Sequence, residues 1–218
     1  MSKTYNIPTL PLPYDLETKI VLKELGIASR KLAELKGVAH TIPNENILIS
    51  TLTLQEARDS SSIENIITTQ DDLYKADLNI RESFASPATK EVQNYREAIS
   101  VGFKYVRAHK ILTNNYIIEI QKSLKHNDEG FRSAPGTVLK NDADGSVVYE
   151  PPQDHMEIVR LMQNLEKFIN DNQMCDYDPL IKMAIIHHQF ESIHPFGDGN
   201  GRTGRIINIL YLVQNDLL

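Results

Sequence analysis

The sequence lacks most features that would take it outside the ordinary globular proteins. Cys175 is the one cysteine in 218 residues, so no internal disulfide can form, and no Cys/His spacing resembles a zinc site. Glycine and proline number only 10 each, which excludes collagen-like and low-complexity chains. The first residues lack a signal-peptide core, and the longest apolar run near the end, 206–213, is too short to span a bilayer. These absences predict a cytoplasmic protein without a membrane anchor.

Positive charge is also scarce. The 23 Lys and Arg against 29 Asp and Glu give a net charge of −6, the wrong sign for wrapping duplex nucleic acid or coating anionic lipid. We therefore expect no direct nucleic-acid binding and no membrane partner. Any phosphate that the protein binds must be met by a local site.

Helical periodicity and capping residues recur along most of the chain and predict an all-α helical bundle. The first expected helix is 15–36, with Leu16, Ile20, Leu25, Leu32 and Leu35 facing inward, and a second is opened by Pro43 and Asn44 and continues toward Ile63. Ser86 is expected to cap a third helix, with Val92, Tyr95, Ile99, Phe103 and Val106 facing inward, and Thr113 to cap a fourth. Asp154 is expected to cap a fifth helix with an apolar stripe at 158–169, and two more follow, 180–193 and one from about Asn200. The helix 180–193 is apolar on nearly every face, Ala184 included, and is expected at the centre of the bundle.

One stretch departs from the helical pattern. Between about Ser133 and Pro152, two short β-rich runs flank a turn at 142–145 that contains Asp142 and Gly145. This arrangement predicts a small β-hairpin.

The segment 194–205, HPFGDGNGRTGR, follows the apolar helix directly. Pro195 ends that helix, glycines at 197, 199 and 201 allow close approach of the backbone, and a new helix starts at Asn200 or Gly201. Free N–H groups at a helix N-terminus favour an anion, so the loop is predicted to hold phosphate. Arg202 and Arg205 lie three residues apart on one helical face and can contact successive phosphates.

Two further side chains give this loop its predicted chemistry. Asp198 would repel a polyphosphate unless a hard cation lies between them, which implies Mg²⁺ held by one carboxylate, phosphate oxygens and water, with help from the Asn200 amide. His194 is placed to take a proton from an incoming hydroxyl. The combination predicts a transferase acting on a phosphate ester.

At these residues the chain resembles the Fic family, whose motif reads HPF, any residue, Asp or Glu, GN, Gly or Lys, R, two of any, R; every fixed position matches between His194 and Arg205. The resemblance extends over most of the chain from about residue 50. It implies a Fic-type helical bundle with a β-hairpin flap that pairs with a target segment, and transfer of AMP from ATP to a Ser, Thr or Tyr hydroxyl of a target protein. Gly201 favours this activity, because the kinase-like Doc branch carries lysine there.

The resemblance also implies a role for each residue of the motif. His194 would be the general base, Asp198 the Mg²⁺ ligand and Phe196 an inward-facing anchor. The residues implied to bind ATP or its phosphates are Gly197, Asp198, Gly199, Asn200, Gly201, Arg202 and Arg205, with Arg202 at the α/β region and Arg205 at the γ-phosphate.

A second stretch, Ser60 to Asn65, fits the family's inhibitory pattern of Ser or Thr, three of any, Glu, then Gly or Asn. A Glu64 carboxylate paired with Arg205 would occupy the place of the γ-phosphate and leave the α-phosphate misaligned for attack. The sequence thus predicts an autoinhibited enzyme with its inhibitory helix on the N-terminal side, residues 1–85 forming that region and 86–218 the catalytic core.

Other interpretations stay open at this point. The same site could remove AMP, with Glu64 orienting a water, or the domain could be an idle helical module that docks partners through the flap. A homodimer is possible. A zinc site at His187, Glu191 and His194 is disfavoured beside an anion-binding loop. Only 13 residues follow Arg205, whereas many relatives continue into further helices, so part of the adenine pocket is expected to be absent.

Overall fold

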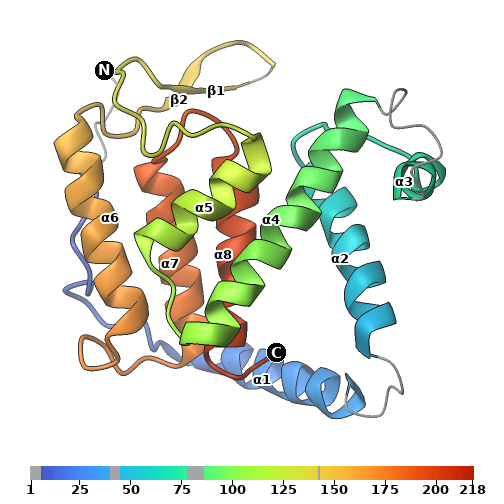
Figure 1. Cartoon of the computed structure of the whole chain (residues 1–218). Coiled ribbons are helices and arrows are strands. Elements are labelled where there is room, and N and C mark those ends of the chain that lie inside the picture. The colour runs from blue at the N-terminus through green and yellow to red at the C-terminus, as the bar shows by residue number, and fades with distance from the viewer. Residues whose placement is uncertain (1–5, 40–44, 78–85, 142) are drawn as a thin grey trace.

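Two adjacent helices, α7 (Pro179–Ile193) and α8 (Asn200–Gln214), lie between α6 (His155–Asn170) and α4 (Pro87–His109) in the computed structural model (Figure 1). The structure describes residues 6–39, 45–77, 86–141 and 143–218. Its other helices are α1 (Lys19–Ala39), α2 (Glu45–Ser62), α3 (Gln70–Asp77) and α5 (Asn114–Lys125). The fold is therefore all-α with one small sheet, as predicted, although α3 was not anticipated.

The predicted caps fix where the core helices begin. Ser86, Thr113 and Asp154 each accept a hydrogen bond from a backbone N–H in the first turn of the helix that follows, and Asp178 does the same for α7. The apolar stripes of α4, α5 and α6 are buried in one continuous core, with Phe103 only partly covered. None of the described helices is both long enough and apolar enough to cross a bilayer.

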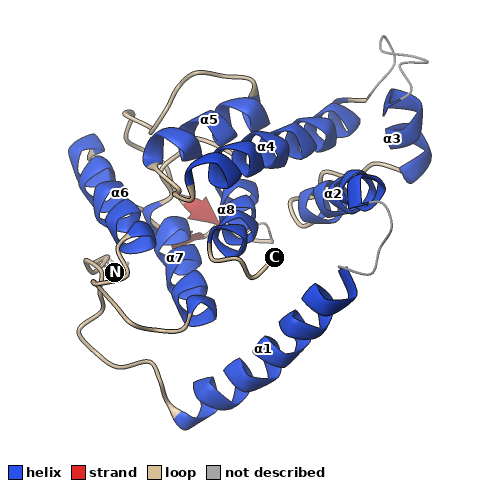
Figure 2. Ribbon diagram, turned by 60° about the horizontal axis from the view of Figure 1, so that its bottom comes forward, coloured by secondary structure: helices blue, strands red, loops and turns tan. Residues whose placement is uncertain are grey.

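The first helix differs from its prediction. It begins at Lys19, and Ile20 and Leu35, expected to face inward, are 77% and 55% exposed. The physical reason is that α1 lies at the edge of the bundle and contacts it along α7, so much of its surface faces solvent (Figure 2). Leu16 and Leu25 do pack against the core from their partly buried positions.

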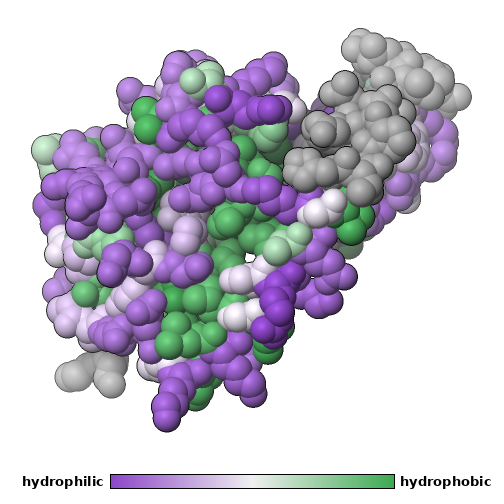
Figure 3. Space-filling model, turned by 90° about the horizontal axis from the view of Figure 1, so that it is seen from below, coloured by the Kyte–Doolittle hydropathy of each residue, from purple (hydrophilic) through white to green (hydrophobic). Residues whose placement is uncertain are grey.

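Because α1 does not cover it, one face of α7 is open. Ala184 on this face is exposed, although it was expected to be buried. An apolar groove of about 590 Å³ separates α1 and the segment 8–16 from this face. On the face seen from below, hydrophobic residues form a continuous region in the middle of the molecule (Figure 3). The prediction of a fully enclosed α7 was wrong on this side.

The predicted hairpin is present and short. Strands β1 (Leu139–Lys140) and β2 (Val147–Tyr149) pair antiparallel, with Leu139 opposite Tyr149. They lie over the end of the bundle where α7 and α8 meet (Figure 1). Asp142 of the predicted turn, like Pro43 and Asn44 of the second predicted helix, lies outside the described residues.

Candidate active site

The loop between α7 and α8 is held in shape from within. His194 ends α7 in the left-handed conformation, with φ of 50°. The Asn200 side chain accepts a hydrogen bond from the Phe196 backbone N–H at 2.9 Å and donates one to the Phe196 carbonyl at 2.8 Å. Phe196 is completely buried between Phe131 and Phe190. Phe196 is thus the inward anchor that was expected, whereas both polar groups of the Asn200 side chain are committed to the loop itself.

An arginine that the sequence analysis did not single out also fixes this loop. The Arg132 guanidinium donates to the carbonyl oxygens of His194 and Pro152, and the Arg132 backbone N–H donates to the Pro195 carbonyl at 2.8 Å. Arg132 is only 7% exposed. It joins the loop 194–199 to the segment that follows the hairpin, so it positions His194.

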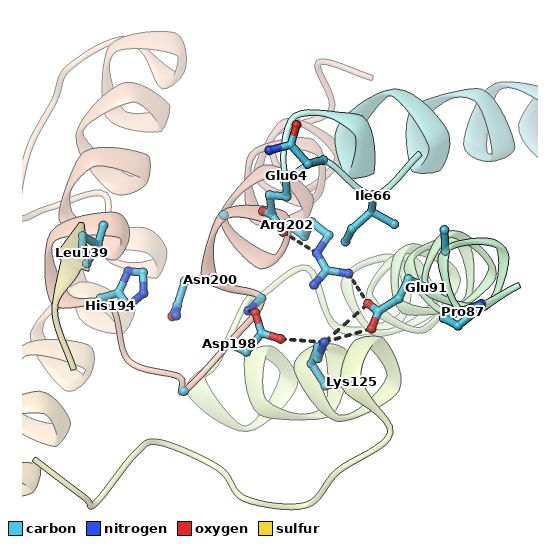
Figure 4. Close-up of a pocket in the computed structure, with 15 residues that line it drawn as sticks. Glu64, Ile66, Pro87, Glu91, Lys125, Leu139, His194, Asp198, Asn200 and Arg202 are labelled. Atoms are coloured by element: carbon cyan, nitrogen blue, oxygen red, sulfur yellow. Dashed lines mark hydrogen bonds and ion pairs between the residues drawn. The ribbon is translucent and has the colours of Figure 1, made fainter. Parts of the chain in front are cut away.

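The loop opens into a cavity of about 780 Å³. Its walls come from the end of α2, the start of α4, the end of α5, the flap and the N-terminus of α8 (Figure 4). Among the residues predicted for the site, those that line it are Glu64, Asn65, His194, Gly197, Asp198, Gly199, Asn200, Gly201 and Arg202.

Glu64 contacts both arginines of α8. One carboxylate oxygen accepts a hydrogen bond from Arg205 Nη2 at 2.9 Å, and the other accepts one from Arg202 Nε at 2.7 Å. Arg205 also donates to the hydroxyl and the carbonyl oxygen of Ser60. The sequence predicted the pair with Arg205, but the contact with Arg202 was missed.

The backbone after α2 explains why this glutamate reaches the arginines. Asn65 has φ of 59°, and the N–H groups of Asn65 and Ile66 donate to the carbonyls of Ser62 and Ser61. This is a Schellman-type helix end, whose left-handed residue favours Gly or Asn. The Gly-or-Asn position of the inhibitory pattern is thereby explained by the turn that follows Glu64.

Two other side chains extend the charged cluster, and neither was predicted. Glu91 of α4 accepts a hydrogen bond from Arg202 Nη1, and Lys125 of α5 lies 3.1 Å from Glu91. The same Lys125 Nζ lies 2.7 Å from an Asp198 oxygen. Arg202 is therefore held between two carboxylates, with its side chain only 2% exposed.

These contacts set the charges of the site. Burial alone would raise the pKa values of Glu91 and Asp198, but hydrogen bonds from Arg202 and Lys125 to Glu91, and from Lys125 to Asp198, outweigh it and lower both. Burial lowers the pKa of His194, and the positive charge of Arg132 lowers it further. The imidazole of His194 is consequently neutral at pH 7 and able to accept a proton.

Two models of one family match this chain in succession. The Fic/DOC family N-terminal model matches residues 22–104, and the Fic/DOC family model matches residues 111–212. The chain belongs to the Fic/DOC family. Residues 60–65, predicted to be inhibitory, fall within the first matched region, and the loop 194–205 falls within the second.

Solved structures support this fold for the Fic chain. A Fic domain-containing signaling protein from Bacteroides thetaiotaomicron superposes with a TM-score of 0.69 at 20% identity, over 86% of this chain and 72% of that one. A Fic family protein from Desulfovibrio desulfuricans gives 0.68 at 22% identity, over 92% of this chain and 59% of that one.

Relatives with curated names match over shorter stretches. A probable protein adenylyltransferase from Aquifex aeolicus is 38% identical over 71 residues, which is 32% of this chain and 21% of the relative. Protein adenylyltransferase fic-1 from Caenorhabditis elegans is 31% identical over 58 residues, 27% of this chain and 11% of the relative. The Fic chain thus matches only a small part of each relative's length.

The site of this Fic chain also suits the predicted metal. Asp198 presents a carboxylate that is 67% exposed at the edge of the cavity, and a lysine ammonium already stands beside it as a cation. Among the described residues, no three His, Cys, Asp or Glu side chains form a metal-binding cluster. One carboxylate with phosphate oxygens and water is a usual arrangement for Mg²⁺, so the donors present fit that ion rather than a protein cage.

Proposed function

We propose that this protein transfers AMP from ATP to a Ser, Thr or Tyr hydroxyl of a target protein, and that Glu64 holds it in an inhibited state. One observation carries the proposal: a single cavity brings together a histidine, an exposed carboxylate and the arginine-bearing N-terminus of a helix. The names of the adenylyltransferase relatives support the choice of AMP as the transferred group.

In the proposed reaction, the target hydroxyl loses its proton to the neutral imidazole of His194 as its oxygen bonds to the α-phosphorus of ATP. The bond from that phosphorus to the bridging oxygen breaks, and pyrophosphate leaves. The N-terminus of α8 and the two arginines would stabilise the charge on the phosphates. Asp198 would hold Mg²⁺, which supplies positive charge at the phosphate oxygens when bound.

The inhibition follows from which groups Glu64 occupies. Its two oxygens take hydrogen bonds from Arg202 and Arg205 that phosphate oxygens would otherwise receive. Ser60 holds Arg205 in the same position through its hydroxyl and carbonyl. A triphosphate would have to displace Glu64 to place its γ-phosphate on Arg205, so ATP would bind poorly or out of line for attack.

The flap is the proposed contact for the target. Val147 and Val148 are 52% and 69% exposed, and Leu139 of the facing strand lines the catalytic cavity. An extended peptide could add to this short sheet and bring its hydroxyl toward His194.

The test is label transfer from ATP in host-cell lysate. The Glu64→Gly variant is incubated with Mg²⁺ and ATP labelled at either the α- or the γ-phosphate, and modified peptides are identified by mass spectrometry. We expect label from the α-position only, with loss of transfer in Glu64→Gly/His194→Ala. Label from the γ-position would indicate phosphoryl transfer, and no label from either would indicate an idle binding module.

A further inference from the structure

The charged groups of the site form an unbroken row of alternating sign. In order along the row they are Arg205, Glu64, Arg202, Glu91, Lys125 and Asp198. Three positive and three negative side chains make the row electrically neutral. It ends at Asp198, the carboxylate proposed for the metal, and the cation next to that end is Lys125.

Lys125 is built into the site by packing as well as by charge. It is the last residue of α5, and its side chain is only 16% exposed. A Cβ placed on Gly199 would lie 3.3 Å from Lys125 Cδ, so the lysine stem runs directly beside the catalytic loop. In the close-up, its Nζ lies between Glu91 and Asp198 on the cavity wall (Figure 4).

This position lets one ammonium serve two states. While Asp198 lacks a metal ion, Lys125 neutralises it and prevents two carboxylates from facing each other without a cation. If Asp198 held a divalent ion, Lys125 would keep only Glu91, which Arg202 already shares. The charge of Lys125 would then be available to an anion in the cavity.

We infer that Lys125 is a third phosphate-binding cation of this site, and that before nucleotide binds it occupies the metal carboxylate as an internal counter-ion. The inference rests on the proposed use of ATP and Mg²⁺. Under this inference, Lys125 weakens the binding of a metal ion to Asp198 and strengthens the binding of the nucleotide. A lysine that served only to hold α5 against the loop would affect both ligands in the same direction.

The experiment measures the two ligands separately in the full chain carrying Glu64→Gly. Mn²⁺ binding without nucleotide is followed by electron paramagnetic resonance. Binding of the α,β-methylene analogue of ATP with saturating Mg²⁺ is followed by calorimetry, and this analogue cannot transfer AMP. The variants are Lys125→Met, which keeps the stem, and Lys125→Arg. Lys122→Met is the matched control, because Lys122 lies on the same helix but pairs outside the site with Asp128.

We expect Lys125→Met to bind Mn²⁺ about tenfold more tightly, because the competing charge is gone. The same variant should bind the ATP analogue roughly tenfold more weakly, and Lys125→Arg should restore most of that loss. Adding Asp198→Asn should remove the gain in Mn²⁺ binding. Lys122→Met should change neither affinity.

Weakening of both ligands by Lys125→Met, or no change in either, would overturn the inference. If the methionine variant does not fold by circular dichroism, Lys125→Gln takes its place with the same two expectations. Because neither measurement needs AMP transfer, a protein that failed to label any target could still pass or fail this test.

Discussion

Replacement of Glu64 should strengthen the binding of ATP far more than that of AMP. Glu64 accepts one hydrogen bond from Arg202 and one from Arg205, and a triphosphate must displace both. Hydrogen bonds to charged groups contribute about 1.5–3 kcal/mol each. The Glu64 side chain is 28% exposed and Arg202 keeps Glu91, so we count the two bonds together as one such bond. A gain of about 1.5–3 kcal/mol corresponds to roughly 10- to 150-fold in affinity.

The measurement is calorimetry with the α,β-methylene analogue of ATP and with AMP. The affinity for the triphosphate should rise by the full factor of roughly 10 to 150 in Glu64→Gly. It should rise less in Glu64→Gln, which keeps the size of the side chain but not its charge. AMP lacks the γ-phosphate that would compete with Glu64 for Arg205, so its affinity should rise by less than that of the triphosphate. Asp59→Asn is the control, because Asp59 lies on the same helix and pairs only with Arg58 among the contacts described.

An Arg205 variant distinguishes two effects of replacing Glu64: release of the arginine for phosphate binding, and loss of the ion pair as such. Arg205→Ala also breaks the contact with Glu64, but it removes a proposed γ-phosphate ligand. It should therefore not raise ATP affinity, and Glu64→Gly/Arg205→Ala should behave like Arg205→Ala. Equal gains for ATP and AMP in Glu64→Gly, or a gain in Arg205→Ala, would refute the reasoning.

Three further expectations concern single groups. Asp198→Ala should abolish transfer together with its dependence on Mg²⁺, and full activity of the parent protein in excess chelator would contradict the metal assignment. Because burial lowers the pKa of His194 from the ordinary 6.5, kcat/KM should reach half of its plateau below pH 6.5; a half-maximum at pH 7 or above would count against a neutral base. Burial raises the pKa of Glu191 above its ordinary 4.5, so the folded protein loses stability as pH rises from there; Glu191→Gln should raise Tm at pH 8 but not at pH 4 by differential scanning fluorimetry.

The sequence was most informative where neighbouring residues carry the chemistry. His194, Asp198 and Arg202 lie within one turn and one loop, so their spacing places them together whatever surrounds them. Helix starts were equally accessible, because a cap such as Ser86 acts on the next three residues.

The features that the sequence did not predict depend on contacts between segments that are distant along the chain. Glu91 and Lys125 lie on separate helices and meet Arg202 and Asp198 only through the packing of α4, α5 and α8. An ordinary glutamate in α4 carries no local sign of that contact. The inward face of α1 was misjudged for a related reason, since periodicity identifies an apolar stripe but not whether another helix covers it. The division at residue 85 and the homodimer stay predictions.

The glycine at 201 makes room for the Glu64 side chain. A Cβ at this position would stand 2.6 Å from a Glu64 carboxylate oxygen, closer than real Cβ contacts allow. A side chain at 201 would therefore push the Glu64 carboxylate away from its present position against Arg202 and Arg205. If Glu64 inhibits as proposed, a residue larger than glycine at 201 would weaken that inhibition. The two positions, 137 residues apart, are therefore expected to change together in evolution.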